Sequence, residues 1–346
     1  MWSDALLERG LVPDALIRRE IRRVVARWLA EERAVDAGEA LAREERLVAA
    51  MRERPVAAAG GEEDARPDEG PPGLPDLVLG ARRLSSCALF ADGAATLDAA
   101  EEAMLALACE RARLVDGQNV LDLGCGRGAL ALYVAERFPQ SRVVAVAASG
   151  PEREAVEESA ATRNLSNVKV VSCDLGSFDP ATGPAFDRVV SAETFGRVAN
   201  WPELLGRIAS WLKPDGRLFL QVASHRELSS PGVARGEADG LARNPCAGGL
   251  VPSDHLVLRF PEHLWVEERW RVSGTHYART AEAWLANLDR NRRAARALLA
   301  KAGGPAAARR GLLERRLSLL SRAELFGARG GSEWMVSQYR LRRRYV

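Results

Sequence analysis

Short β-rich runs alternate with helical runs through the middle of the chain, and this alternation limits the possible folds more than any other feature. Five runs are predicted strands, at residues 119–123, 142–147, 168–172, 186–191 and 217–222. Helical patterns lie among them, at residues 129–138, 151–163 and 202–212. Because strand–helix–strand units of this kind build parallel sheets, we predict an α/β fold with a doubly wound sheet.

The part of the chain before this core is predicted to be helical and then irregular. In the N-terminal helical segment, residues 1–54, residues 12–53 have helical character throughout, with apolar side chains on one face and arginines on the other. Such a helix could lie on a membrane surface, but nearby acids dilute its charge, which favours a helix packed against the core. Residues 55–75 are rich in proline, glycine and acids and predict a linker.

The remaining residues divide into a core and a cap. We predict a core over residues 76–225, with an added helix at 97–114, and a C-terminal cap over residues 226–346. The cap is predicted to be mostly helical over residues 280–325. It also supplies two strands, at 264–273 and 333–343, which bring the expected sheet to seven strands.

Composition excludes several classes of partner. The formal net charge of +2 argues against a nucleic-acid-binding protein, which usually carries a strong basic excess. No apolar stretch is long enough to anchor the chain stably in a membrane, and the first residues lack the pattern of a secretory signal. The five cysteines are widely spaced and have no metal-ligand pattern. We therefore expect free thiols, no metal site and a cytoplasmic protein.

A glycine-rich loop joins the first predicted strand to its helix, at residues 120–128 with the sequence VLDLGCGRG. Glycines let the backbone turn tightly and let a ligand approach the main chain. A dinucleotide-binding loop has two residues between its second and third glycines, whereas one residue separates Gly126 from Gly128. Asp122 would repel a pyrophosphate and attract a ligand with an ammonium and a sulfonium group. We therefore predict S-adenosylmethionine as cofactor, held by Asp122, Gly124, Gly126 and Gly128.

Polar residues after the next predicted strands fit the same ligand. Ser149 and Glu152 follow the second strand, where they can bind ribose hydroxyls. Asp174 and Leu175 follow the third strand, where the carboxylate can accept a hydrogen bond from the adenine amino group. In open α/β sheets, ligands bind outside the carboxyl ends of the strands. The other predicted cofactor contacts are Ser191, in the fourth strand, and Ser86, ahead of the first strand.

Several stretches outside the glycine loop carry a family resemblance. They are GLVPD at residues 10–14, DAAEEAM at 98–104, GGLVPS at 248–253, GTHYA at 274–278 and AELFG at 323–327. With them the chain resembles the coclaurine N-methyltransferases and, more distantly, the cyclopropane-fatty-acid synthases. The resemblance implies a Rossmann-like methyltransferase sheet with a helical N-terminal segment and a C-terminal cap over the donor site. It also implies methyl transfer to the nitrogen of a small-molecule amine, and leaves a homodimer open as the assembly.

The chain departs from the coclaurine-type pattern after the fourth strand. Where that pattern reads EMFEH, residues 193–197 read ETFGR, so Gly196 and Arg197 replace the Glu and His that are thought to take the proton from the substrate nitrogen. Arg197 stays charged and cannot serve as a base, but it could bind an acidic group of the substrate. The tryptophan usual in the glycine loop is Arg127.

A second set of residues resembles the site of the cyclopropane synthases. Cys87, Glu193, His225 and Tyr277 match positions that surround a bicarbonate base in those enzymes. We predict that Glu193 holds the substrate ammonium and helps to remove its proton, with Tyr277 as polar support. His225 is also a catalytic candidate, although a structural role is the favoured interpretation.

Two other functions remain open from the sequence. An enzyme that methylates or cyclopropanates an acyl lipid would use the four residues that match the cyclopropane synthases. A catalytically impaired donor-binding protein would explain Gly196, Arg197 and Arg127.

Overall fold

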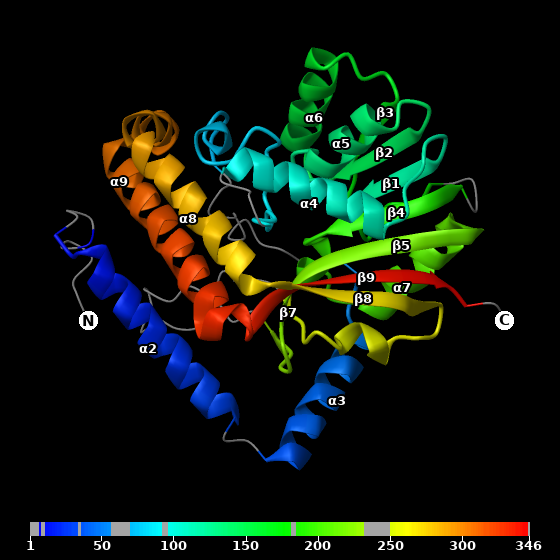
Figure 1. Cartoon of the computed structure of the whole chain (residues 1–346), viewed down its shortest axis with the longest axis horizontal. Coiled ribbons are helices and arrows are strands. Elements are labelled where there is room, and N and C mark those ends of the chain that lie inside the picture. Colours follow the sequence, from blue (N-terminus) through cyan, green and yellow to red (C-terminus); the bar gives the residue numbers. More distant parts are fainter. Residues whose placement is uncertain are drawn as a thin grey trace.

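The core of the protein is one seven-stranded sheet with the strand order β3-β2-β1-β4-β5-β9-β8 (Figure 1). It is seen in a computed structural model that describes residue 7 and residues 11–33, 36–56, 70–91, 96–180, 185–231 and 250–344. The first five strands in this order, β3, β2, β1, β4 and β5, run parallel to one another. Strand β9 lies between β5 and β8 and is antiparallel to both. The strands are β1 (Asn119–Leu123), β2 (Arg142–Ala147), β3 (Val168–Ser172), β4 (Phe186–Ala192), β5 (Leu212–His225), β8 (Leu264–Ser273) and β9 (Trp334–Arg343). The predicted doubly wound α/β fold is confirmed.

Helices cover both faces of this sheet, so its central strands β1 and β4 are buried on two sides. Val190 of β4 packs into a core with side chains of α4 and α5, whereas its neighbour Val189 packs into a core with side chains of α7. The helices are α4 (Leu97–Arg111), α5 (Ala129–Arg137), α6 (Gly150–Thr162) and α7 (Trp201–Trp211). With both faces covered, the strand ends are the part of the sheet that a ligand can reach.

The described part of residues 12–53 forms two helices, so the prediction of continuous helix over this range is wrong. Helix α2 (Asp14–Arg33) and helix α3 (Ala37–Glu53) diverge in a V (Figure 1). The break has a local cause, since the Asp36 carboxylate accepts hydrogen bonds from the backbone N–H of Gly38 and Glu39, at 2.8 and 3.0 Å, and caps α3.

Helix α2 packs against the C-terminal cap. Its buried side chains include Ile17 and Ile21. Arg18 pairs with Glu282 and Glu324, at 2.5 and 2.9 Å. The basic face therefore makes ion pairs within the protein, as expected for a helix packed against the rest of the fold.

The cap is built on two long helices, α8 (Gly274–Arg290) and α9 (Arg292–Gly327). The predicted helical region began at residue 280, but α8 begins directly after β8. Glycine is unfavourable in helices, yet Gly274 is required here because a side chain would collide with the backbone carbonyls of Trp334 and Phe326. Helix α9 kinks at Gly304, where φ is 82°, just before Pro305.

Other predicted boundaries also shift. Residue Leu212, predicted as the end of a helix, begins β5, and Pro214 follows it closely, which disfavours further helix. Strand β5 therefore extends well beyond the predicted 217–222. Helix α4 ends before the predicted residue 114 because Arg113 has a left-handed φ of 52°.

Short elements complete the described structure. They are η1 (Pro75–Leu77), η2 (Thr194–Arg197), η3 (Leu256–Arg259), η4 (Ala328–Gly331), β6 (Ser230–Pro231) and β7 (Leu250–Val251). Most of the predicted linker, residues 57–69, lies outside the described residues. The boundaries of the predicted segments at 54, 75 and 225 remain predictions.

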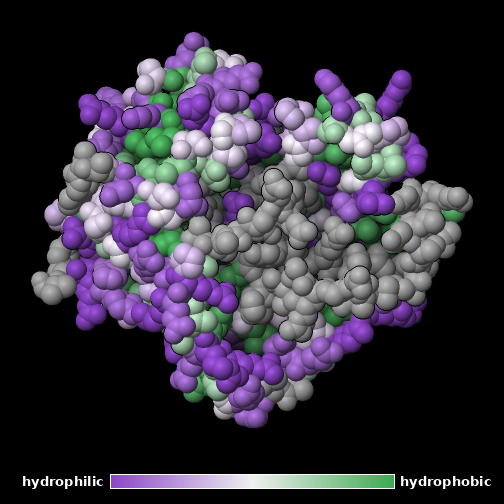
Figure 2. All heavy atoms as spheres, turned by 180° about the vertical axis from the view of Figure 1, so that it is seen from behind, coloured by the Kyte–Doolittle hydropathy of each residue, from purple (hydrophilic) through white to green (hydrophobic). Residues whose placement is uncertain are grey.

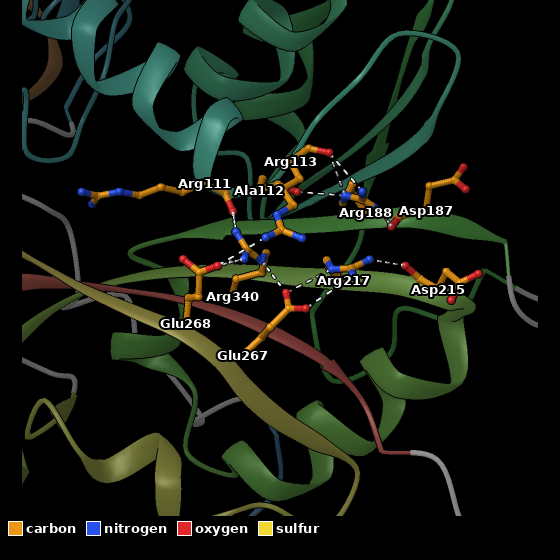
Figure 3. A network of polar contacts seen from close by, with 10 residues as sticks. All are labelled: Arg111, Ala112, Arg113, Asp187, Arg188, Asp215, Arg217, Glu267, Glu268 and Arg340. Carbon is orange, nitrogen blue, oxygen red and sulfur yellow. Dashed lines mark hydrogen bonds and ion pairs between the residues drawn. The ribbon is translucent and has the colours of Figure 1, made fainter.

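An arginine network joins the antiparallel strands to the parallel ones (Figure 3). Glu267 of β8 accepts hydrogen bonds from Arg217 of β5 and Arg340 of β9, at 3.1 and 2.6 Å. Arg340 also contacts Glu268 and donates to the carbonyl oxygen of Arg111, at 2.9 Å. Burial alone would raise the pKa of Glu267, but the hydrogen bonds from Arg217 and Arg340 lower it to about 2.

The coloured part of the face seen in Figure 2 is mixed in polarity. In the view of Figure 2, hydrophobic areas are small and interrupted by hydrophilic residues. Among the helices of the described residues, none combines the length and the apolar character needed to cross a bilayer.

Candidate functional site

The glycine loop lies at the carboxyl end of β1 and is fastened to the neighbouring strand β2. The backbone N–H groups of Gly124 and Cys125 both donate to the carbonyl oxygen of Val146, at 3.1 and 2.8 Å. Gly124, Gly126 and Gly128 have left-handed φ angles of 80°, 53° and 80°. Glycine adopts this conformation at little cost, whereas other residues are strained in it. The backbone at these positions therefore requires the glycines that the sequence provides.

The three glycines differ in the space around them. A side chain at Gly124 would collide with Thr194, and one at Gly128 would collide with Val156 of α6. At Gly126 the nearest atom is the Oγ of Ser85, 3.9 Å from where a Cβ would lie. Two glycines thus allow close packing, and Gly126 leaves the main chain open to a ligand.

Two cavities meet at this loop. The loop cavity is lined by the glycine loop together with Ser86, Asp122 and Glu193. The outer cavity, of about 660 Å³, has Ser149 and Glu152 in its wall. Both cavities are lined by Arg83, Ser85, Gly126 and Arg127.

Asp122 is the buried carboxylate of the loop cavity. It is 2 % exposed, and its Oδ2 has no hydrogen-bond donor among the described residues. Burial raises the pKa of Asp122 to about 7, although a hydrogen bond from the backbone of Ala131 opposes the shift. A buried carboxylate oxygen without a donor is a suitable partner for an ammonium group, so the residues present fit the predicted cosubstrate.

Glu193 is held in place at the carboxyl end of β4. Its φ of 63° is left-handed, a strained conformation for a residue other than glycine. Its Oε2 accepts a hydrogen bond from the backbone N–H of Ala223 at 2.9 Å, and its own N–H donates to the carbonyl of Gln221 at 2.8 Å. Glu193 is also close to Cys87, whose thiol pKa is raised by burial and, secondarily, by the Glu193 charge. The carboxylate thus has a fixed position in the same cavity as Asp122.

The predicted ribose contacts cap helix α6. The Oγ of Ser149 accepts from the N–H of Glu152 at 3.3 Å, and the Glu152 Oε2 accepts from the N–H of Ala148 at 2.9 Å. Both residues line the outer cavity, next to the glycine loop. Their reciprocal capping fixes them there, while their contact with ribose remains a prediction.

Four predicted cofactor contacts remain, and Ser86 lines the loop cavity whereas Asp174, Leu175 and Ser191 do not. Ser86 is buried, lines the loop cavity and accepts a hydrogen bond from Gln221 at 3.4 Å. Asp174 and Leu175 lie at the end of β3 and line neither of the two cavities. Ser191 is fully buried and donates to the carbonyl of Leu123 at 3.0 Å, so its hydroxyl joins β4 to β1.

His225 makes contacts that favour a structural role. Its Nδ1 accepts hydrogen bonds from the N–H groups of Glu227 and Leu228, at 3.1 and 2.9 Å. The proton of the neutral ring must then be on Nε2, which faces the carboxylate of Glu333 at 3.5 Å. Burial lowers the pKa of His225 to about 4, so the ring is neutral at pH 7.

Tyr277 lies in the cap at the start of α8. Its ring is stacked at a tilt on that of Phe326, with centroids 4.3 Å apart, and the Arg322 guanidinium lies 5.6 Å from its centroid. These contacts make Tyr277 part of the packing between α8 and α9. Its predicted support of Glu193 remains a prediction.

Residues 80–90 form one wall of the loop cavity. Sequence reasoning named Ser86 and Cys87 in this segment but missed the contacts that anchor it. At one side the buried Glu101 of α4 accepts from the N–H groups of Gly80 and Arg82, at 3.0 and 2.8 Å. At the other side the N–H of Ala88 donates to Thr280 of α8 at 3.1 Å. The segment therefore couples the core to the cap. In the sequence, these contacts are indicated by Glu101, an acid on the side of α4 that is buried.

Comparison with known proteins agrees with this geometry. The profile of the mycolic acid cyclopropane synthetase family matches residues 74–302. The (S)-coclaurine N-methyltransferase of Thalictrum flavum subsp. glaucum is 35 % identical over 336 residues, covering 96 % of this chain and 92 % of the relative. The (S)-tetrahydroprotoberberine N-methyltransferase of Eschscholzia californica is 33 % identical, covering 78 % of this chain and 77 % of the relative.

Solved structures show the same relationship. A crystal structure of coclaurine N-methyltransferase bound to N-methylheliamine and SAH has a TM-score of 0.90, with 34 % identity and 98 % of each chain covered. The cyclopropane synthase MmaA2 of Mycobacterium tuberculosis has a TM-score of 0.62 at 22 % identity, covering 78 % of this chain and 93 % of that one, and shows the shared fold alone. The chain therefore belongs to the family of S-adenosylmethionine-dependent methyltransferases that includes the coclaurine N-methyltransferases and the mycolic acid cyclopropane synthetases.

Proposed function

We propose that this protein transfers the methyl group of S-adenosylmethionine to the nitrogen of a small-molecule amine, and that Glu193 holds the acceptor. The observation that carries the proposal is that Glu193 and Asp122 line one cavity at adjacent strand ends. The sulfonium of the donor supplies an already activated methyl group. Asp122 holds the donor ammonium, and the open backbone at Gly126 lets the donor lie against the loop.

Glu193 supplies the charge that an amine acceptor needs. An alkylamine is mostly protonated at neutral pH, so it must lose a proton before its lone pair can attack. The fixed Glu193 carboxylate attracts the ammonium and receives that proton directly or through a water. Positioning the two reactants against each other supplies much of the remaining rate enhancement.

The names of the relatives support an amine acceptor. Those at 30 % identity or more over most of this chain include enzymes named for N-methylation of coclaurine and tetrahydroprotoberberine. Acyl-lipid modification gains less support, because His225 has both nitrogens directed to groups of its own turn and to Glu333. A cytoplasmic location and a homodimer remain predictions from the sequence.

Arg197 narrows the acceptor class further within this proposal. It is exposed on η2, four residues after Glu193. Arg197 lines neither of the two cavities, so it would meet a part of the acceptor that extends beyond the loop cavity. Its guanidinium favours an acidic group on that part of the amine. Gly196, beside Arg197, has no side chain and so leaves room for the acceptor.

The proposal is tested by incubating the purified protein with S-adenosylmethionine and a panel of amines. The panel pairs tetrahydroisoquinolines with and without a carboxyl group, and phospholipid vesicles form a separate arm. We expect SAH release with a mass gain of one methyl on an amine. Transfer to lipid alone, or binding of donor with no transfer to any amine, would contradict the proposal.

A further inference from the structure

Arg127 is the middle residue of the last Gly-x-Gly step in the glycine loop, and its surroundings are unusual for an arginine. Its side chain is partly buried and lines both the loop cavity and the outer cavity. The two cavities have three arginines in their walls: Arg83, Arg127 and Arg163. Arg83 pairs with Asp76 at 2.9 Å, and Arg163 lies 4.0 Å from Glu136. Within the described residues, Arg127 has neither an ion pair nor a hydrogen bond.

The charges of the cavity complement those of the amino-acid part of the donor. Asp122 and Glu193 supply two carboxylates, which suit the donor ammonium and the cationic reaction centre. The donor also carries one carboxylate, which would be repelled by these acids unless a cation receives it. Of the three arginines in the cavity walls, Arg127 is the one that has no acidic partner among the residues that the structure describes. Guanidinium groups bind carboxylates through paired, charge-assisted hydrogen bonds.

We propose that Arg127 binds the α-carboxylate of the methionine part of S-adenosylmethionine and of its product SAH. Arg127 and Asp122 then hold the two ends of the same amino-acid group, one by its carboxylate and the other by its ammonium. This inference rests on the proposed use of S-adenosylmethionine. It adds Arg127 to the residues that recognise the donor, through an ion pair between its guanidinium and the donor carboxylate.

The test compares two ligands that differ by one group. SAH carries the carboxylate, and decarboxylated S-adenosylhomocysteine keeps the ammonium, the thioether and the adenosine but lacks it. Isothermal titration calorimetry measures both with the wild type, Arg127→Met and Arg127→Lys. The control is Arg153→Met, an exposed arginine of α6 that lies 4.0 Å from Glu157 and lines neither cavity.

We expect Arg127→Met to weaken SAH binding roughly 10- to 100-fold, as for the loss of a hydrogen-bonded charge pair. The same change should leave the decarboxylated ligand within about twofold of wild type, and Arg127→Lys should keep part of the SAH affinity. Arg153→Met should change neither ligand.

Equal weakening of both ligands by Arg127→Met would overturn the inference and place Arg127 against the adenosine instead. No change with either ligand would also overturn it. If the wild type bound neither ligand, donor use itself would be wrong, and that outcome is distinct from a failure at Arg127. Thermal unfolding of Arg127→Met should match the wild type, which separates a lost contact from a misfolded loop.

Discussion

The two ends of the parallel strands differ in whether their acidic groups have partners within the protein. Toward the amino ends of β4 and β5, the arginine network pairs Arg217 and Arg340 with Glu267 (Figure 3). At the carboxyl ends, Asp122 is as buried as Arg340 but has an oxygen without a donor among the described residues. The first arrangement is complete without a ligand and stabilises the sheet. The second leaves a carboxylate oxygen available to a cation, which is why we propose that the donor ammonium binds there.

The largest expected effect is on donor affinity when the incomplete carboxylate is removed. Asp122→Asn should weaken SAH binding by about 100-fold or more, because a buried ammonium would lose its charged partner. Calorimetry measures the affinity. The matched control is Asp116→Asn, at the other end of β1, where the carboxylate already accepts from the N–H groups of Gly117 and Gln140. We expect the control to bind SAH with the affinity of the wild type. Equal SAH affinity of the two variants would contradict the proposed contact between Asp122 and the ammonium.

The next effect concerns turnover. Glu193→Gln keeps an oxygen for the N–H of Ala223 but removes the charge that would receive the acceptor proton. We expect the catalytic rate to fall by about 100-fold, in the range usual for loss of a general base, with SAH affinity within about tenfold of wild type. Single-turnover rates and titrations provide the two values. A rate near that of wild type would show that another group handles the proton.

A smaller effect is expected at the complete end of the sheet. Glu267→Ala should lower the free energy of unfolding by about 2 kcal/mol, because it removes a carboxylate partner from the buried Arg340. Glu268 continues to contact Arg340, which limits the loss. Denaturant unfolding measures the change, with exposed Glu157→Ala as control. Donor affinity should stay unchanged, and a large loss of affinity would contradict the separation of the two regions.

The smallest effect is a pH dependence of binding. Burial raises the pKa of Asp122 to about 7 in the folded protein, so the carboxyl is mostly protonated at pH 6 and mostly ionised at pH 8. A protonated carboxyl binds an ammonium poorly, so SAH affinity should rise with pH, by up to roughly tenfold between these values. Asp122→Asn should remove this dependence. A flat profile in the wild type would mean that Asp122 does not contact the ammonium.

The same contrast explains what could be predicted from the sequence. The alternation of strands and helices predicted the sheet, and the glycine spacing predicted the tight turn after β1, because both are local patterns. Binding of the donor at this turn remains a prediction. The break at Asp36 was missed because a side-chain cap competed with an otherwise helical pattern. The start of α8 at Gly274 was missed because close contact with Trp334, distant in sequence, requires glycine there.

The site residues divide in the same way. Asp122 and Glu193 meet in one cavity because the strand order brings the carboxyl ends of β1 and β4 together. Ser86 joins them from the segment ahead of α4, which the strand pattern does not place. Glu101 could not be predicted, because its partners Gly80 and Arg82 are about twenty residues away. The commitment of Ser191 and His225 to internal hydrogen bonds likewise depends on tertiary contacts.

A crystal structure with bound SAH tests the central assignment most directly. The amino group of SAH should lie within hydrogen-bonding distance of the Asp122 Oδ2, with the amino-acid part against Gly126. An empty glycine loop, or SAH bound with its amino group away from Asp122, would contradict the assignment.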